Sequence, residues 1–337
     1  MKPTDFSKNL TEFLIKYLPG ERGASKNTIA SYKDTFILFL VFLNENKGIS
    51  ADEVYLKSIT KEIVVDFLNW IEEDRKCCIA TRNVRLAAIH SFFQYLQYKH
   101  PENLFLWQNI LSIPIKKTKK TTINYLSLDG IKLILEQPDQ SSSRGRRDLA
   151  LLSLMYDSGA RVQEIIDLTP SMVRLEPPCT VKLIGKGNKA RIVPLLDKQL
   201  IFLKNYMIEN RLLESHANKY PLFSNSKKEK LTRAGMNYIL GKYIKLAKQK
   251  SPSLYPGKLS CHSLRHSKAM HLLQAGVNLI YIRDILGHSS VQVTEIYART
   301  DSKKKREVIE KAYTDVTPDK APSWLSNDDL LEWLKSF

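Results

Sequence analysis

The sequence predicts a mainly helical protein that carries a small β-hairpin and divides into two principal domains. Three observations support this fold class: apolar residues at helical spacing in the first third, two short strand-like segments around a glycine-containing turn, and a basic segment without apolar residues between the two parts. The chain has 337 residues, of which 43% are hydrophobic, so each domain is long enough to bury a core of its own.

The first third is predicted to contain four helices. Apolar residues recur at helical spacing along 6–18, 29–43, 63–71 and 84–96. Ser25 precedes the second helix and is its predicted N-cap, because a serine hydroxyl accepts a bond from an unpaired N–H of the first turn. The apolar stripe of the fourth helix consists of Val84, Ala88, Phe92 and Leu96.

Residues 116–122 consist of lysine and threonine and provide no apolar anchor, which is typical of an exposed linker. This places a helical domain at 1–115, a basic linker at 116–122 and a mixed domain at 123–316. Prolines at 318 and 322 then separate a tail, 317–337. The tail ends in a short helix whose apolar stripe must dock, either on its own domain or on a neighbouring subunit. That stripe consists of Leu330, Trp333, Leu334 and Phe337.

The domain at 123–316 mixes helices with one hairpin. Strand-like segments at 180–184 and 190–194 flank a turn that contains Gly187 and Asn188, which suits a β-hairpin. Helices are expected at 126–135, 148–157, 198–210, 233–248 and through 261–298.

Charge and cysteine usage indicate the class of partner and the compartment. Lysine and arginine number 52 against 35 acidic residues, a formal net charge of +17, which favours a polyanionic partner over a merely basic surface. The four cysteines lack zinc-finger or CxxC spacing, so reduced thiols are expected. No signal peptide or apolar run long enough to span a membrane is recognisable, and a cytoplasmic protein is expected.

Five residues of the predicted domain at 123–316 have the chemistry needed to cleave a phosphodiester. Arg161 and Arg265 carry forked, permanent positive charge that suits two phosphate oxygens. His262 and His288 can donate or accept protons near neutral pH. Tyr297 can attack, provided that nearby cations favour its phenolate. Two of them have a simpler reading. Tyr297 could be a buried core residue, and Arg161 could form a surface ion pair with Glu164, three residues on.

The motifs that contain these residues resemble the active site of the tyrosine recombinases, the phage integrase family. The resemblance covers about 125–315 and has its motifs in the family's order. They are GARVQE (159–164), GKGNKAR (185–191), HSLRHS (262–267), and LGHSS (286–290) followed by EIY (295–297). The helical domain at 1–115 is similar to the family's SAM-like core-binding domain by pattern alone.

The resemblance implies a role for each position. Arg161 and Arg265 would clamp the phosphate, and Tyr297 would be the nucleophile. Lys186 would protonate the leaving 5′ oxygen, with Lys182, Lys189 and Arg191 as nearby competitors and a solvated turn lysine as the simpler reading. His262 would act as acid and base, and His288 would donate to a phosphate oxygen. Supporting roles fall to Glu164, which would orient the site, and to His266, which would pack or bond behind Arg265.

Candidate DNA contacts come from polar residues near the starts of two predicted helices and from the lysines of the basic linker. Polar residues at helix starts suit phosphate and base-edge contacts, although a solvated helix face is an equally good reading. The candidate DNA contacts are Lys26, Asn27, Lys33, Arg82, Arg85, Lys116, Lys117, Lys119 and Lys120.

The implied fold is a two-domain, C-shaped clamp around duplex DNA. The implied reaction is site-specific recombination through a 3′-phosphotyrosyl intermediate and a Holliday junction, by a homotetramer on two DNA sites with paired inverted repeats. The protein could be a monomer in solution, and no membrane partner is expected. Whether accessory proteins take part is an open question. No metal and no cofactor is needed, because the phosphotyrosyl bond conserves the energy for rejoining.

Several roles within this chemistry stay open. Because the chain begins almost directly in the core-binding pattern, a simple recombinase is expected, and integration or excision of a mobile element is favoured over resolution of chromosome or plasmid dimers. A type IB topoisomerase or a telomere resolvase could use the same residues. A DNA-binding regulator on a recombinase fold is the non-enzymatic alternative.

Overall fold

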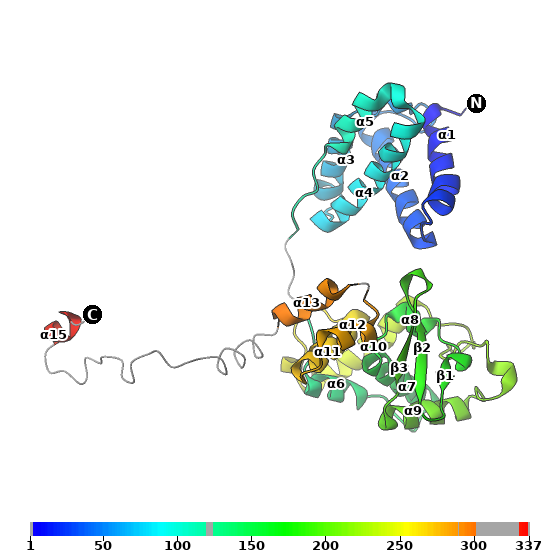
Figure 1. Cartoon of the computed structure of the whole chain (residues 1–337), viewed down its shortest axis with the longest axis vertical. Helices are drawn as coiled ribbons and strands as arrows, with labels where there is room; N and C mark the ends of the chain where they lie inside the picture. Colours follow the sequence, from blue (N-terminus) through cyan, green and yellow to red (C-terminus); the bar gives the residue numbers. More distant parts are fainter. Residues whose placement is uncertain (1–2, 119–123, 289, 301–329, 336–337) are drawn as a thin grey trace. The chain divides into compact units, whose positions relative to one another are not determined.

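The computed structural model describes residues 3–118, 124–288, 290–300 and 330–335 (Figure 1). It divides the chain into two compact units, Met1–Thr121 and Thr122–Phe337. Both are built mainly from helices, and one small sheet lies in the second, so the predicted fold class is confirmed. In the described part, no helix combines the length and apolar character that crossing a membrane requires.

Every secondary-structure element in the described part of the first unit is a helix. Its elements are α1 (Asp5–Glu12), the π-helix η1 (Phe13–Glu21), α2 (Lys26–Lys47), η2 (Leu56–Ser58), α3 (Lys61–Glu73), α4 (Ile79–Lys99), η3 (Pro101–Asn103) and α5 (Leu104–Leu111). The predicted cap of α2 is confirmed, since the Ser25 hydroxyl accepts from the Thr28 N–H at 3.2 Å. Thr60 caps α3 in the same way, through the N–H of Ile63.

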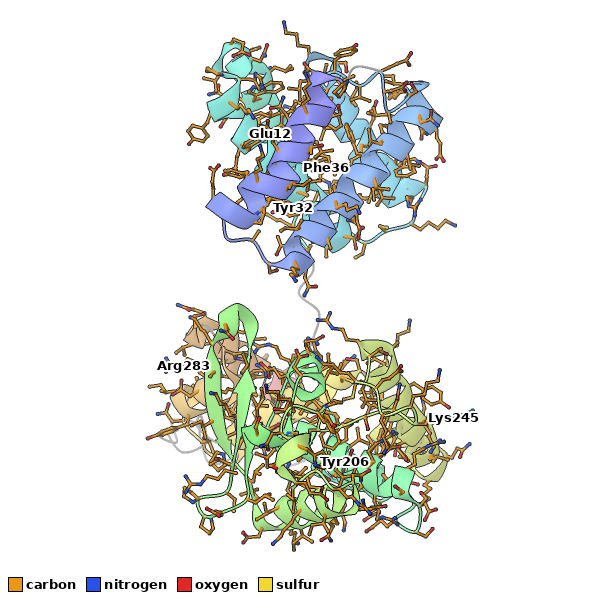
Figure 2. All side chains as sticks on the ribbon, turned by 90° about the vertical axis from the view of Figure 1, so that its right-hand side faces the viewer. Glu12, Tyr32, Phe36, Tyr206, Lys245 and Arg283 are labelled. Carbon is orange, nitrogen blue, oxygen red and sulfur yellow. The ribbon has the colours of Figure 1, made fainter. Side chains whose placement is uncertain are left out.

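Aromatic rings fill the core of the first unit. Phe13, Phe36 and Phe92 meet edge to face, with ring centroids 5.2–6.4 Å apart. Figure 2 shows Tyr32 and Phe36 on α2, the helix that contributes the Phe36 ring to this core. The predicted stripe of α4 is buried at Ala88, Phe92 and Leu96, but Val84 is exposed, which corrects that position.

Helix α5 was not predicted from the sequence. It buries Trp107, whose indole N–H donates to the carbonyl of His100 at 3.1 Å. The segment is short and almost uniformly apolar, so it has no helical periodicity to detect. Its burial completes the core beneath α3 and α4.

The second unit contains more helices and the sheet. Its elements are α6 (Leu128–Leu135), α7 (Ser143–Asp157), α8 (Val162–Ile166), η4 (Pro170–Met172), β1 (Val173–Arg174), β2 (Thr180–Ile184), η5 (Lys186–Asn188), β3 (Ala190–Pro194), α9 (Asp197–Glu209), η6 (Ser215–Ala217), α10 (Arg233–Lys250), η7 (Pro252–Leu254), α11 (Cys261–Gln274), α12 (Leu279–Leu286) and α13 (Val291–Thr300). Helix α15 (Leu330–Lys335) lies in the tail.

Helix α7 forms the centre of the second unit. Every side chain from Leu149 to Met155 is buried, so this part of the helix is enclosed on all sides and has no solvent-facing stripe. Tyr206 on α9 packs in the same core, whereas Lys245 on α10 projects from the rim (Figure 2). The chain leaves the end of α7 directly into the GARVQE motif, so that motif starts from a rigid support.

The predicted hairpin is confirmed, and the structure adds a third strand. Strands β2 and β3 pair antiparallel with Val181 opposite Val193, and β1 pairs with the other edge of β2. Val181 and Leu183 point into the core, as the alternation of a strand requires. Strand β1 has only two residues, too few for a sequence pattern. Its absence from the prediction follows from that length.

Residues 261–298 fold as three helices rather than as one long rod. Helix α12 ends at Gly287, which takes a left-handed conformation with φ 63°. Glycine is favoured there because a side chain strains this backbone region. The turn sends the chain into α13 and brings the end of α12 close to α8 and β3. Helices α11, α12 and α13 gather beside one another in Figure 1.

Candidate active site

Arg161 lies at the start of α8 and is held there by a carboxylate three residues on. Its backbone N–H and its Nη1 donate to the two oxygens of Glu164 at 2.7 and 2.9 Å. Its Nη2 donates to the carbonyl of Gly287 at 3.2 Å. The side chain remains 32% exposed, so part of the guanidinium is available to a ligand. The alternative reading, an ion pair with Glu164, is therefore correct for the structure without DNA and is compatible with phosphate binding.

Arg161 lines a pocket of about 460 Å³ at the surface of the second unit. Its lining includes Lys189, Arg191 and His288, so cationic and hydrogen-bonding groups converge on one space. This combination suits an anion such as a phosphate. Among the described residues, no group of three or more His, Cys, Asp or Glu side chains could hold a metal ion.

Arg265 lies on α11 and is buried. Its Nη1 donates to the carbonyl of Gly159 and its Nη2 to the carbonyl of Leu286, both at 2.6 Å. Burial, and then the positive charges of Arg161 and Arg191, lower the pKa of Arg265 to about 10. The guanidinium therefore stays charged at neutral pH. Each terminal nitrogen keeps a second N–H, so Arg265 ties two motifs together and can still donate.

Glu164 is the carboxylate at the centre of this arrangement. It is buried, and it accepts from Arg161 and, through both oxygens, from Arg191 at 2.9 and 2.7 Å. Burial alone raises the pKa of Glu164, but the bonds from Arg191 and Arg161 outweigh it and leave the pKa lowered. A Cβ at Gly185 would come within 2.9 Å of Oε1, so the hairpin approaches Glu164 closely because residue 185 is glycine.

Arg191 is the residue that sequence reasoning underrated, since it was named only as a competitor of Lys186. It donates to both oxygens of Glu164, and its Nε donates to the carbonyl of Ile285 at 2.7 Å. The alternation of side chains along β3 could have indicated that Arg191 points inward. Arg191 shares the inward face with Val193, while Ile192 between them points outward.

Two histidines contact the tyrosine, and a third lies beside one of them on α11. His266 on α11 forms a hydrogen bond of 2.9 Å between its Nδ1 and the hydroxyl of Tyr297. His288 stacks its ring on Tyr297, with centroids 6.3 Å apart, and bonds Thr294 at 3.0 Å through Nδ1. His262 is exposed one turn before His266. His266 was expected behind Arg265, and its contact with the tyrosine hydroxyl is a correction.

All three histidines are held in the neutral form. Burial, followed by Arg265 and Arg161, lowers the pKa of His262 and, more strongly, that of His288 to about 4. Burial also lowers the pKa of His266, with His262 and Arg265 adding to the effect. A neutral imidazole has one nitrogen that donates and one that accepts, so each ring can bond a phosphate oxygen or take a proton.

Tyr297 on α13 is enclosed in this structure. Its side chain is 3% exposed and packs among apolar residues of α11 and α12. Burial raises the pKa of Tyr297, while Arg265 and Arg161 lie near enough to oppose that rise. The sequence predicted a tyrosine close to the two guanidinium groups, and the structure brings them together. The alternative reading of Tyr297 as a buried core tyrosine is also met, because its ring is enclosed while the two guanidinium groups lie near it.

The predicted general acid lies at the tip of the hairpin. The backbone of Lys186 forms the turn η5 with Gly187 and Asn188, and both of these residues have positive φ angles. The side chain of Lys186 is outside the described part of the structure.

The candidate DNA contacts of the first unit differ in exposure. Lys26, Asn27 and Lys33 project from α2 into solvent. Arg82, by contrast, is 5% exposed, and its Nη1 donates to the carbonyl of Pro114 at 3.0 Å. Arg85 is partly buried and donates to the carbonyl of Ser31 at 3.1 Å. Burial removes Arg82 from the surface, so its prediction as a DNA contact is corrected, and the partners of Arg85 hold it within the unit.

The lysines of the linker are described only in part. Lys116 and Lys117 are exposed, and the Nζ of Lys116 donates to Glu72 at 2.8 Å. Lys119 and Lys120 lie outside the described residues.

Two protein-family models match the chain. The model of the phage integrase family matches residues 124–304, and the model of the phage integrase N-terminal SAM-like domain matches residues 10–100. Together they cover parts of both units.

Curated relatives match over nearly the whole chain. A putative integrase/recombinase, y4rC, of Sinorhizobium fredii is 33% identical over 97% of this chain and 97% of its own length. A tyrosine recombinase XerC of Herpetosiphon aurantiacus is 31% identical over 88% of this chain and 91% of its own length.

Solved structures share the fold. The XerH site-specific recombinase bound to difH substrate, in a pre-cleavage complex, superposes with a TM-score of 0.65 at 25% identity and covers 89% of this chain and 84% of its own. The Tn1549 transposon integrase in complex with transposon right end DNA is 14% identical, with a TM-score of 0.66 over 90% of this chain and 98% of its own. At that identity, the second likeness concerns the fold alone.

Proposed function

The chain belongs to the phage integrase family of tyrosine recombinases, and on that premise we propose that it is a site-specific DNA recombinase acting through Tyr297. The observation that carries the proposal is the convergence of Arg161, Arg265, His288 and Tyr297 in one region of the second unit. Two guanidinium groups next to a tyrosine suit nucleophilic attack on a phosphodiester, because they neutralise the charge that grows on the phosphate oxygens.

In the proposed reaction the phenolic oxygen of Tyr297 forms a bond to phosphorus, and the bond from phosphorus to the 5′ oxygen breaks. The product is a 3′-phosphotyrosyl bond and a free 5′ hydroxyl. Lys186 supplies the proton that the leaving oxygen takes, and a neutral histidine accepts the tyrosine proton. Arg161 and Arg265 bind the non-bridging oxygens, His288 donates to one of them, and Glu164 orients Arg161.

The enclosed position of Tyr297 adds a step before this chemistry. A side chain with 3% exposure cannot reach a phosphate without moving, and its hydroxyl must first leave Nδ1 of His266. The movement falls to α13, which follows α12 after the segment 287–290. His262, exposed one turn away on α11, is then the proposed acceptor of the tyrosine proton.

The proposed architecture on DNA follows from the two units. The domain at 1–115 and the domain at 123–316 would hold the duplex between them, with the basic linker 116–122 along the backbone. Lys26, Asn27 and Lys33 are the exposed candidates for contacts from the first unit. Sequential strand exchanges through a Holliday junction by a tetramer on two inverted-repeat sites complete the proposal. XerH in complex with difH is a relative bound to its DNA substrate and supports a DNA partner here.

The test of this function is capture of the covalent intermediate. In a duplex with a nick close to the scissile phosphate, the short fragment that carries the new 5′ hydroxyl dissociates after attack, so rejoining is prevented and the protein remains attached to DNA. Wild-type protein should form this adduct, and Tyr297→Phe should bind the same duplex without forming any. Lys245→Ala, on the outer rim, is a control that should retain the adduct. Adduct formation by Tyr297→Phe would exclude Tyr297 as the nucleophile.

The tail is the proposed contact between subunits. Helix α15 exposes Leu331 and Leu334, and the rest of 317–337 lies largely outside the described residues. Deletion of 321–337 should weaken assembly on two sites more than binding of one monomer to one half-site, measured by sedimentation and gel shift. Equal losses in both assays would contradict an exchange of the tail.

The biological role proposed is integration or excision of a mobile element, and the similarity to y4rC is compatible with it. Resolution of chromosome or plasmid dimers is the alternative that the XerC relative suggests. Paired inverted repeats around a short spacer, next to the gene or at the chromosome dimer site, would distinguish the two. Relaxed supercoils or hairpin ends as products would instead indicate a topoisomerase or a telomere resolvase.

A further inference from the structure

We propose that Arg191 is a positioning residue that fixes the catalytic arginine and the His288 turn relative to the hairpin. The proposal rests on the recombinase function above and adds a residue to its machinery. Arg191 would act through Glu164 and through the end of α12, without touching the DNA.

All three guanidinium nitrogens of Arg191 are used inside the protein. Nη1 and Nη2 donate to the two oxygens of Glu164 at 2.9 and 2.7 Å, and Nε donates to the carbonyl of Ile285 at 2.7 Å. The side chain is 11% exposed. A planar fork with every nitrogen engaged has one stable orientation, which a lysine cannot reproduce.

Glu164 transmits this orientation to Arg161. The same two carboxylate oxygens accept the backbone N–H and the Nη1 of Arg161 at 2.7 and 2.9 Å. Four donors from two arginines therefore converge on one buried carboxylate, which has about four lone-pair sites. Without Arg191, Glu164 would keep only its bonds to Arg161 and could rotate with it.

The contact with α12 extends the same control to His288. A Cβ on Gly287 would lie 2.9 Å from Nη1 and 3.0 Å from Cδ of Arg191, so the arginine packs directly against this turn. The carbonyl of Gly287 accepts from Arg161, and the next residue is His288. Arg191 thus packs against the turn at Gly287, and Arg161 donates a hydrogen bond to the carbonyl of the same residue.

The division of labour between the two arginines follows from their exposure. Both arginines line the pocket, but Arg161 is 32% exposed and has spare donor capacity, whereas Arg191 is 11% exposed with each nitrogen bonded. The charge of Arg191 also contributes to the lowered pKa of His288. Loss of Arg191 should therefore disturb geometry and raise the pKa of that histidine.

The test compares Arg191→Met and Arg191→Lys with wild-type protein on the nicked duplex at saturating protein. A small displacement of aligned groups costs about 10²-fold in rate, so Arg191→Met should form the adduct about 10²-fold more slowly with unchanged Kd. Arg191→Lys keeps the charge but not the fork and should recover little of the rate. In NMR titrations, the pKa of His288 should rise in Arg191→Met.

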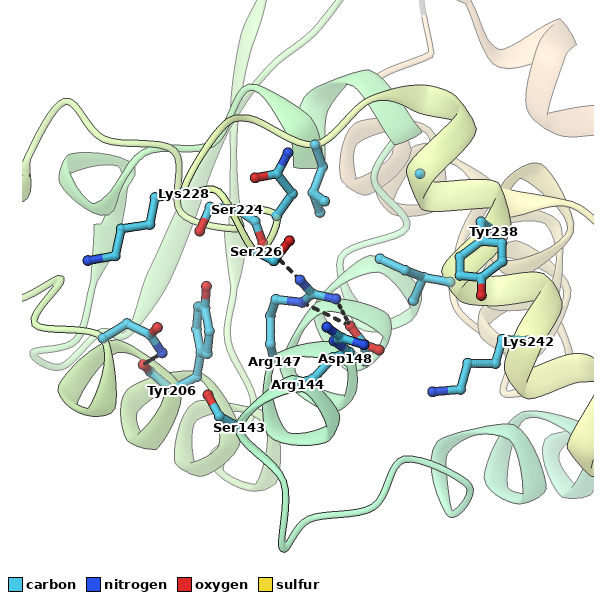
Figure 3. A pocket seen from close by; sticks show the side chains of 15 residues that line it. Ser143, Arg144, Arg147, Asp148, Tyr206, Ser224, Ser226, Lys228, Tyr238 and Lys242 are labelled. Atoms are coloured by element: carbon cyan, nitrogen blue, oxygen red, sulfur yellow. Dashed lines mark hydrogen bonds and ion pairs between the residues drawn. The ribbon is translucent and has the colours of Figure 1, made fainter.

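Arg147 provides a matched control in the same unit (Figure 3). Its Nε and Nη2 donate to Asp148 at 2.9 and 2.6 Å, its Nη1 donates to the carbonyl of Ser224 at 2.9 Å, and its side chain is 15% exposed. It lines a separate pocket of about 580 Å³, whose lining shares no residue with the Arg161 pocket. Arg147→Met should lower Tm but leave the adduct rate of the folded protein and the His288 titration unchanged.

Three results would overturn the proposal: a wild-type rate in Arg191→Met, full recovery by Arg191→Lys, or equal rate losses in Arg191→Met and Arg147→Met. If wild-type protein forms no adduct, the proposed recombinase function fails, and the role of Arg191 fails with it. If wild-type protein is active, the rates of the Arg191 variants test the role of Arg191 alone. If Arg191→Met does not fold, Gly287→Ala disturbs Arg191 in another way, because the added Cβ crowds its guanidinium while every polar group is retained. It should show the same selective loss of rate, and a wild-type rate in Gly287→Ala would contradict the proposal.

Discussion

The hydroxyl of Tyr297 lies 2.9 Å from Nδ1 of His266 on a side chain that is almost fully enclosed. Burial raises its pKa, so the phenol is protonated where the structure holds it. Arg265 and Arg161 already oppose that shift. A phenolate therefore becomes accessible only where the ring moves out of the apolar cluster toward these charges. In the proposed reaction, Tyr297 would therefore attack only after its ring has moved toward a bound phosphate.

The pH dependence of stability should report on His288. Its pKa of about 4 in the folded protein lies below the ordinary value of 6.5, so the unfolded chain binds a proton that the folded chain does not. The free energy of unfolding should therefore fall as the pH drops from about 6.5 to about 4. His288→Gln cannot bind this proton and should lose less stability over that window, measured by urea unfolding at several pH values. A parallel pH profile in the variant would contradict a depressed pKa at this residue.

Individual helices begin where short polar side chains satisfy the first turn. The hydroxyls of Ser25, Thr60, Ser127 and Thr232 each accept a backbone N–H at the start of a helix. Helix ends at glycine have the complementary function, and Gly287 turns the chain between α12 and α13. The elements that carry the candidate site are thus short helices with defined starts and ends, joined by turns that bring His288 and Tyr297 to α11.

The cap of α2 offers a direct measure of this effect. Ser25→Ala removes the acceptor for the Thr28 N–H and should lower the free energy of unfolding of the first unit by about 1 kcal/mol. Ser25→Asn keeps a capping oxygen and should restore most of that loss. Urea unfolding followed by tryptophan fluorescence suits this test, because Trp70 and Trp107 are both buried in the first unit. Equal stabilities of the alanine and asparagine variants would show that the cap contributes little.

The molecule as a whole combines two separate cores with a large positive charge. One apolar cluster is built from the first unit and two from the second, so each unit contains the interactions that stabilise its own fold. The net charge of +17 is carried by a chain that spans both. Such a molecule associates with DNA through many phosphate contacts, each of which releases counterions.

Binding should therefore weaken steeply with salt. At roughly 6–10 phosphate contacts, affinity falls by about 10³–10⁵-fold between about 50 and 200 mM salt. Lys33→Ala should reduce the slope of log K against log salt by about one, because Lys33 is exposed on α2. Arg82→Ala should leave the slope unchanged, because Arg82 is buried and bonded to Pro114. A smaller slope in Arg82→Ala would return that residue to the DNA surface.

Local patterns in the sequence predicted much of the fold. The start of α2, the pairing of β2 with β3 and most of the buried face of α4 follow from the Ser25 cap, alternation and helical spacing. Strand β1 and helix α5 were missed because two residues and a uniformly apolar run contain no period. Arg82 was misassigned because charge on a helix does not reveal which face is buried.

The sequence alone determined the family and the helical class and predicted the set of reactive side chains, because the order and spacing of motifs are properties of the chain itself. Only the tertiary structure decided that Tyr297 is enclosed, that its hydroxyl is bonded to His266 and that Arg191 links β3, Glu164 and the end of α12. These contacts join residues 27 to 94 positions apart, and such pairs form when helices and strands pack. No local periodicity encodes them, since distance in space is set by how the elements fill a shared core.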